Sequence, residues 1–151
     1  MDPDKRINLL KDEYIMLQNF YEDIDSKGLT VKGWAITVAL AAIGTGLLYR
    51  REVFLIGLFA ALVFWYLEAY WRGLSHFFAA RIQEIEQAFR SGKWKEEVPL
   101  QVYSTWAKEY EKSKDQTLRY MFKPAARLPH LVIGAIQLIL YILSLLNMLP
   151  K

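Results

Sequence analysis

The chain of 151 residues contains no cysteine, so disulfides, thiolate nucleophiles and thiolate metal sites are all excluded. Histidine is scarce, because His76 and His130 are the only two and lie far apart in the sequence. The metalloprotease pattern HExxH, the phosphate-binding pattern GxxxxGK, the dinucleotide pattern GxGxxG and the hydrolase pattern GxSxG are also missing. We therefore expect neither an enzyme nor a bound metal or other cofactor.

Ionised side chains are nearly absent from three long apolar runs, residues 33–49, 53–71 and 131–149, which contain a single one, Glu68. As a helix rising about 1.5 Å per residue, each run approaches the roughly 30 Å thickness of a bilayer's hydrocarbon core. The hydrophobic content of 54% and the aromatic content of 15% exceed those of ordinary soluble domains. The sequence predicts an all-α membrane protein with three transmembrane helices.

The first two runs are separated only by Arg50, Arg51 and Glu52. This spacing predicts a tight turn, and hence a transmembrane hairpin over residues 33–71, with a C-terminal transmembrane helix over residues 129–151. The alternative, one helix through all of 33–71, would place two arginines in the middle of the membrane at a high cost in free energy.

Residues 1–32 predict an amphipathic helix, with Gly28 as its end because glycine favours the left-handed turn that terminates helices. Its apolar side chains recur three and four residues apart, as in helices that pack in bundles. We expect this oligomer seam to hold copies of the chain together; it consists of Ile7, Leu10, Tyr14, Leu17, Tyr21 and Ile24.

Residues 72–128 predict a helical segment outside the membrane. The second span is expected to continue as an amphipathic helix until Ser91 and Gly92, and a further helix is expected from about residue 101 to residue 121. Pro124 and Pro129 then mark the entry to the last span.

Lysine and arginine are distributed unevenly about the spans, with five in residues 1–32 and eleven in residues 72–128, against Arg50, Arg51 and Lys151 on the other side. Basic residues near span ends are retained in the cytoplasm. We therefore expect a multi-pass protein of the cell inner membrane with a cytoplasmic amino terminus, and amphipathic helices on the cytoplasmic side.

Glu68 is the one acid within an apolar run, and Arg72 lies one helical turn further on. The spacing predicts an ion pair that orients the span. An intramembrane carboxylate can also conduct ions or protons, which is the alternative role for Glu68.

Two of the spans carry lines of small or polar residues. Small residues form one stripe on the first span, at Ala35, Ala39, Ala42 and Gly46, which would let another helix approach closely. One interpretation is that the polar lines are helix contacts within one subunit. The alternative is that they line a path for ions, which would have to lie between subunits because three helices alone cannot enclose a pore. The candidates for pore lining or helix contact are Thr37, Ala41 and Thr45 on the first span and Gln137, Tyr141 and Ser144 on the last.

The stretch 11–46, together with the hairpin and the long helix after it, resembles the SLATT family of small microbial membrane proteins. The likeness is carried by Tyr14, Leu17 and the segments 21–25, 32–34 and 41–44, within about residues 5–90. The resemblance implies a two-span effector that perforates membranes in nucleotide-triggered antiphage systems. This chain differs by its third span and by the lack of a recognisable nucleotide-sensing domain.

The function expected from these features is an oligomeric effector that permeabilises or depolarises the inner membrane in a bacterial antiphage or conflict system. The alternative is a membrane-anchored scaffold or accessory subunit that recruits a cytoplasmic partner. The expected partners are the lipid bilayer, further copies of the chain and a cytoplasmic sensor protein, and not a nucleic acid, because the net charge of +3 is modest.

Overall fold

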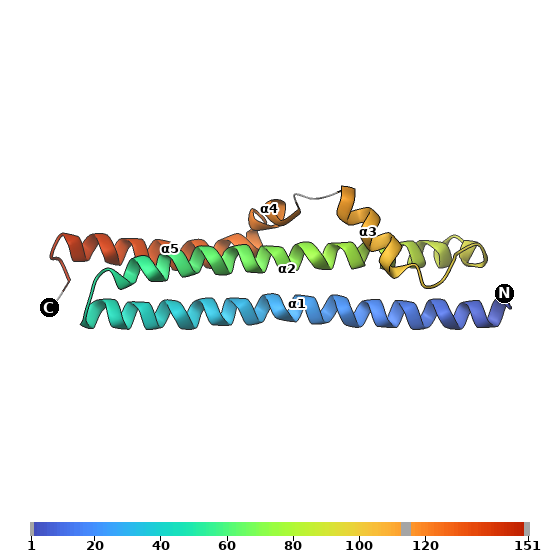
Figure 1. The fold of residues 1–151 in the computed structure, drawn as a ribbon, viewed down its shortest axis with the longest axis horizontal. Helices are drawn as coiled ribbons and strands as arrows, with labels where there is room; N and C mark the ends of the chain where they lie inside the picture. Colours follow the sequence, from blue (N-terminus) through green and yellow to red (C-terminus); the bar gives the residue numbers. More distant parts are fainter. Residues whose placement is uncertain (1, 113–115, 150–151) are drawn as a thin grey trace. The chain divides into compact units, whose positions relative to one another are not determined.

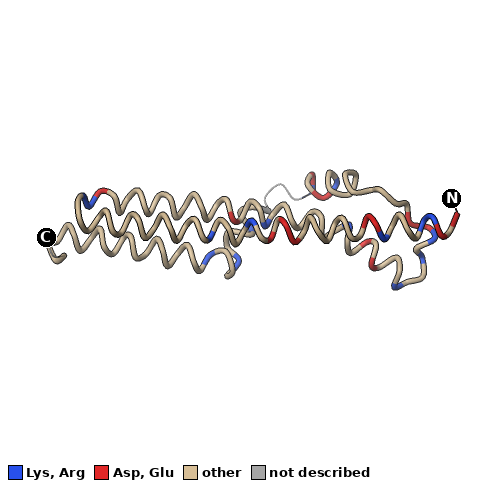
Figure 2. Tube along the Cα trace, turned by 90° about the horizontal axis from the view of Figure 1, so that it is seen from below, with Lys and Arg blue, Asp and Glu red and all other residues tan. Residues whose placement is uncertain are grey.

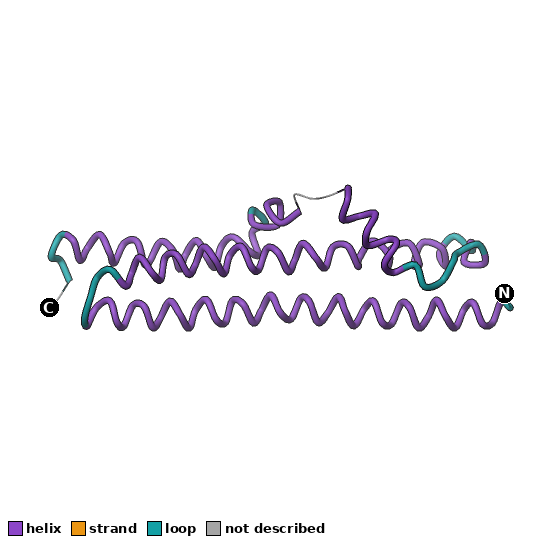
Figure 3. Tube along the Cα trace, in the orientation of Figure 1, coloured by secondary structure: helices purple, strands orange, loops and turns teal. Residues whose placement is uncertain are grey.

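The computed structural model describes residues 2–112 and 116–149, and every regular element in these ranges is a helix (Figure 1) (Figure 3). The all-α prediction is therefore confirmed for the described part of the chain. The elements are α1 (Pro3–Leu48), α2 (Val53–Arg90), the short 3-10 helix η1 (Lys93–Lys95), α3 (Val102–Lys112), α4 (Gln116–Met121) and α5 (Pro124–Leu145).

Three of these helices, α1, α2 and α5, are long and apolar enough to cross a membrane. They contain nearly all of the three apolar runs of the sequence, and α1 and α2 extend well beyond theirs. Figure 2 shows the corresponding stretches almost free of charged residues.

The turn between α1 and α2 is as short as the sequence predicts. α1 ends at Leu48 and α2 begins at Val53. The backbone N–H groups of Val53 and Phe54 donate to the carbonyls of Arg50 and Arg51 at 3.1 Å, which closes the first turn of α2. The alternative of a single helix through residues 33–71 is wrong.

The prediction that a helix ends at Gly28 is also wrong, because α1 continues through it without a break. A glycine inside a helix costs only about 1 kcal/mol relative to alanine. Gly28 is buried, as are Ile24 and Val31 on the same side of α1, so packing of this face offsets that cost. Gly28 therefore lies on a packed face of a continuous helix and does not form a turn.

The end of α2 agrees with the prediction, since the helix stops at Arg90 and Gly92 adopts a left-handed φ of 72°. The helix expected over about 101–121 is found as two helices, α3 and α4, and residues 113–115 lie outside the described ranges. Pro124 is the first residue of α5, where its missing N–H costs nothing, and Pro129 lies inside the helix.

The chain divides into two compact units. The charged unit comprises Met1–Ser26 and Trp71–Gln116, and the apolar unit comprises Lys27–Tyr70 and Thr117–Lys151. The core of the charged unit is formed by Leu10 and Leu17 of α1 with Ile82 and Ile85 of α2, and Val102 of α3 packs against it.

In the apolar unit, α1 and α2 approach closely along the stripe of small residues. Ala35, Ala39 and Ala42 are all buried. At Gly46 there is no room for a side chain, because a Cβ would lie 2.6 Å from Cε1 of Phe54. The stripe therefore serves as a helix contact within the chain.

Candidate functional site

Three ionisable side chains meet inside the apolar unit, one from each of the long helices. Glu68 of α2 accepts from Lys32 of α1, with Nζ 3.1 Å from Oε1. The second carboxylate oxygen, Oε2, lies 3.0 Å from Nε2 of His130 on α5. Glu68 is completely buried and His130 is 2% exposed, so this cluster is largely closed to water.

The chemistry of this triad follows from its burial. A buried carboxylate is costly unless it is paired and hydrogen-bonded, and Lys32 supplies the opposite charge. His130 donates to Glu68 when the proton is on Nε2, and its Nδ1 is buried without a hydrogen-bond partner among the described residues. The triad thus ties α1, α2 and α5 together at one point.

Sequence reasoning missed Lys32 and His130 as partners of Glu68, because they lie on other helices. The ion pair predicted between Glu68 and Arg72 stays a prediction. In the charged unit, Arg72 contacts Asp25, with Nη1 3.3 Å from Oδ1. The sequence did offer one indication of these partners. Lys32 and His130 each directly precede an apolar run, so each was placed where it could pair with an acid inside the apolar unit, such as Glu68.

Gln137 is the second buried polar group of the apolar unit. Its Nε2 donates to the backbone carbonyl of Ala39 at 2.9 Å, and its exposed fraction is 0%. Gly57 of α2 makes room for it, since a Cβ at that position would lie 2.6 Å from Cδ of Gln137. The structure therefore uses Gln137 as a contact between helices of the same chain.

The other predicted polar candidates fall into two groups that do not meet. Tyr141 and Ser144 lie half-buried on α5. Three residues are exposed along one face of α1: Thr37, Ala41 and Thr45. The hydroxyl of Thr37 donates a hydrogen bond to the backbone carbonyl of Gly33 at 3.0 Å. These three residues form an uncovered polar face of α1, whereas Tyr141 and Ser144 on α5 are partly covered.

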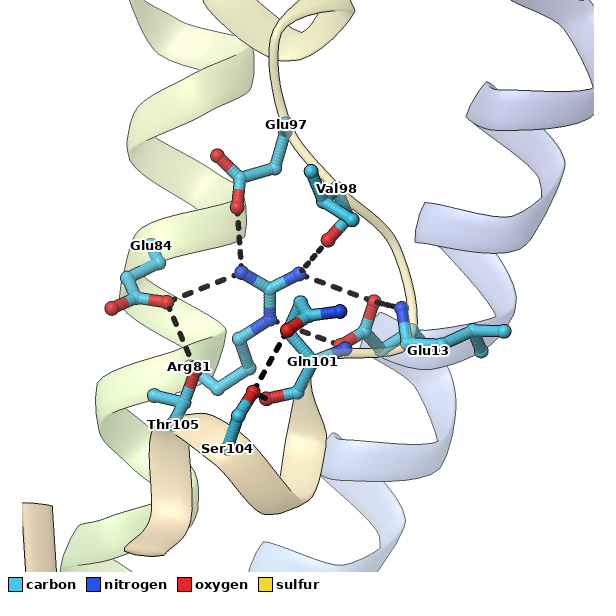
Figure 4. Close-up of polar contacts among 9 residues, drawn as sticks. Glu13, Arg81, Glu84, Glu97, Val98, Gln101, Ser104 and Thr105 are labelled. Atoms are coloured by element: carbon cyan, nitrogen blue, oxygen red, sulfur yellow. Dashed lines mark hydrogen bonds and ion pairs between the residues drawn. The ribbon is translucent and has the colours of Figure 1, made fainter. Parts of the chain in front are cut away.

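A network of polar contacts surrounds Arg81 in the charged unit (Figure 4). The guanidinium is 2% exposed and bonds Glu13 through Nε at 2.9 Å and Nη2 at 3.3 Å. Its Nη1 reaches Glu97 at 2.6 Å and Glu84 at 3.1 Å, and Nη2 also donates to the carbonyl of Val98 at 2.8 Å. All the guanidinium nitrogens therefore have partners.

The electrostatics of this site favour a permanently charged arginine. Burial opposes the charged form, but the hydrogen bonds that Arg81 donates to Glu13, Glu97 and Glu84 outweigh it and raise the pKa of Arg81. Arg81 lies where the carboxylates of Glu13, Glu84 and Glu97 converge.

Glu13 also fixes the loop that leads into α3. Its two carboxylate oxygens accept from the backbone N–H groups of Leu100 at 2.7 Å and Gln101 at 3.1 Å. Leu100 has a left-handed φ of 65°, which is unusual for a residue other than glycine. Glu13 thus connects α1, α2 and this loop through one buried side chain.

Part of the predicted oligomer seam packs within the chain, and its role between copies stays a prediction. Leu10, Leu17 and Ile24 are buried, and the first two pack against α2 of the same chain. Apolar positions spaced three and four apart predict a packed face but cannot identify the partner helix. Ile7 and Tyr14 remain half-buried and Tyr21 exposed at the edge of this contact.

Among the described residues, no group of three or more histidine, aspartate or glutamate side chains is placed to hold a metal ion. Comparison of the chain with protein-family models, with curated proteins and with solved structures finds no match.

Proposed function

We propose that this chain is a membrane effector whose copies assemble in the bacterial inner membrane and let ions leak across it during a conflict such as phage infection. In this arrangement α1, α2 and α5 cross the bilayer, and the amino terminus and the charged unit lie in the cytoplasm. The distribution of lysine and arginine about the spans supports this orientation. The resemblance to SLATT proteins supports the perforating activity.

The observation that carries the proposal is the uncovered polar face of α1. Thr37 and Thr45 are exposed on a helix whose stripe of small residues, at Ala35, Ala39 and Ala42, is already packed. The Thr37 hydroxyl donates to the carbonyl of Gly33 within its own helix, but its oxygen can still accept a hydrogen bond, which lipid does not offer. A polar line on an outward face is therefore better matched to water or to another helix. Three helices cannot enclose water, so several copies must bring these faces together.

In this proposal the Lys32, Glu68 and His130 triad holds the three helices of each copy together and does not itself conduct. Both oxygens of Glu68 are engaged, by Lys32 and by His130. Gln137 has the same supporting role, through its bond to the carbonyl of Ala39.

The proposal is tested by ion flux from liposomes that contain the purified chain. The double substitution Thr37→Val with Thr45→Val removes two hydroxyl groups at nearly constant shape and is expected to abolish most of the flux. Ile36→Val is the matched control, because Ile36 is 49% exposed on the same helix and carries no polar atom. Equal flux from the three proteins, or no flux from any of them under a membrane potential, would contradict the proposal.

A membrane-anchored scaffold is the second candidate, and one observation favours it. The charged unit exposes apolar and aromatic side chains around the start of α3, with Leu100 66% and Tyr103 78% exposed. Such a surface suits a protein partner. A scaffold would still bind its partner when Thr37 and Thr45 are changed to valine. Neither the unsubstituted chain nor this double variant would then conduct ions.

A further inference from the structure

A groove of about 500 Å³ lies in the charged unit between the beginning of α1 and the end of α2. Its base is apolar and closed, because Leu10 is 0% and Ile85 is 2% exposed. Apolar parts of Ile7, Tyr14 and Phe89 line it further out. Phe89 is 42% exposed, so the groove presents apolar surface to whatever lies beside it.

Charged groups of both signs border this groove. Lys11 of α1 and Arg90 of α2 are basic, and Glu86 of α2 is acidic. The hydroxyl of Tyr14 donates to Oε1 of Glu86 at 2.9 Å, which orients the carboxylate at the edge of the groove. All three charged residues are exposed.

We propose that this groove is the contact surface for a second copy of the same chain, groove against groove. The inference rests on the proposed membrane insertion, because two copies with the same topology are related by a twofold axis along the membrane normal. Under that symmetry each residue meets residues of similar depth in the other copy. Lys11 is one turn from Tyr14 on α1, and Arg90 is one turn from Glu86 on α2.

This geometry brings opposite charges together across the contact, although Lys11 of one copy and Arg90 of the other also come close. Glu86 of one copy faces Lys11 and Arg90 of the other within about one helical turn, a distance that these long side chains bridge. Ile7 and Phe89 of the two copies meet between the charged pairs and exclude water from the apolar base. Each copy thus contributes both the acid and the bases, whereas an unrelated helix would need to supply its own matching pattern.

The contact is tested by disulfide cross-linking of the full-length chain in membranes, which is simplified by the absence of native cysteine. Lys11→Cys in one copy and Glu86→Cys in a differently tagged copy are expected to form a mixed disulfide on mild oxidation. Asp12→Cys replaces Lys11→Cys in the control pair, because Asp12 is exposed but does not line the groove. Absence of the mixed disulfide, or equal yields from both pairs, would overturn the proposal.

Charge reversal gives a second and independent readout, the mass of the detergent-extracted particle. Lys11→Glu alone and Glu86→Lys alone each place like charges together and are expected to lower the association constant about tenfold or more. The double variant restores opposite charges and is expected to recover the association. A double variant as weak as the single ones would refute the pairing, as would cross-linking of the groove to a different polypeptide.

Ion flux separates this contact from the proposed activity. Specific cross-linking together with no flux would leave the contact standing and reject perforation. Flux that survives with no cross-linking and no response to charge reversal would reject the contact alone.

Discussion

Glu13 and Arg81, which are 68 positions apart in the sequence, form a two-pronged ion pair inside the charged unit, with N–O distances of 2.9 and 3.3 Å. Two parallel N–H donors on one carboxylate give strength and fix the orientation of both side chains. The same carboxylate accepts from the backbone of Leu100 and Gln101. One residue of α1 therefore determines how α2 and the loop before α3 are held.

Glu13→Gln is predicted to destabilise the charged unit strongly. The substitution removes one of the charges that compensate a guanidinium only 2% exposed, and breaking a buried ion pair typically costs about 3–5 kcal/mol. The free energy of unfolding, measured by denaturant titration of the purified chain in detergent, reports the loss. Glu22→Gln on the exposed face of α1 is the control and should change stability by less than about 0.5 kcal/mol.

Lys32→Met is predicted to destabilise the apolar unit, because it leaves Glu68 buried with His130 as its remaining partner in the triad. Adding Glu68→Gln to Lys32→Met removes the uncompensated charge and should recover part of the lost stability. The double-mutant cycle, measured from the thermal unfolding midpoints in detergent, isolates the pair interaction. Strictly additive effects of the two substitutions would contradict the pairing.

Gly57→Ala is predicted to disturb the packing of the three long helices. Its Cβ would lie 2.6 Å from Cδ of Gln137 and 2.8 Å from Cβ of Ala42, and overpacking of this kind costs about 1–3 kcal/mol. Gly44→Ala is the matched control, because nothing lies within 4 Å of a Cβ at that position. The thermal midpoint should fall for Gly57→Ala and stay level or rise for Gly44→Ala; the reverse order would refute this packing.

Leu100→Gly is predicted to preserve or raise stability, which is unusual for the loss of a large apolar side chain. Leu100 has a φ of 65° and is 66% exposed, so little burial is lost, and the left-handed conformation costs a non-glycine residue about 1–2 kcal/mol. Val98→Gly is the control, since Val98 is 59% exposed and is absent from the positive-φ residues of the described chain. Urea titration should rank Leu100→Gly above Val98→Gly.

The parts of the fold that depend on local sequence could be predicted. The apolar runs predicted the three long helices. The charged residues Arg50, Arg51 and Glu52 predicted the turn between the first two, and Gly92 predicted the end of α2. The helix end predicted at Gly28 was wrong because the low helix propensity of glycine is a weak effect compared with tertiary packing. The sequence does not reveal which glycines are buried.

The contacts between distant residues could not be predicted. Glu68 with His130 and Glu13 with Arg81 join helices that are far apart in the sequence, and no spacing rule relates them. The stripe of small residues on α1 was visible, but which helix it contacts depends on the tertiary structure.

Every function proposed for this chain requires three membrane crossings, and site-directed labelling tests them most directly. Because the chain has no cysteine, Asn8→Cys, Arg50→Cys and Met148→Cys each provide a single reactive group for a membrane-impermeant maleimide. We predict that Asn8→Cys reacts only from the cytoplasmic side, and that Arg50→Cys and Met148→Cys react only from the opposite side. Reaction of Asn8→Cys and Met148→Cys from the same side, or recovery of the chain in buffer without detergent, would contradict the account.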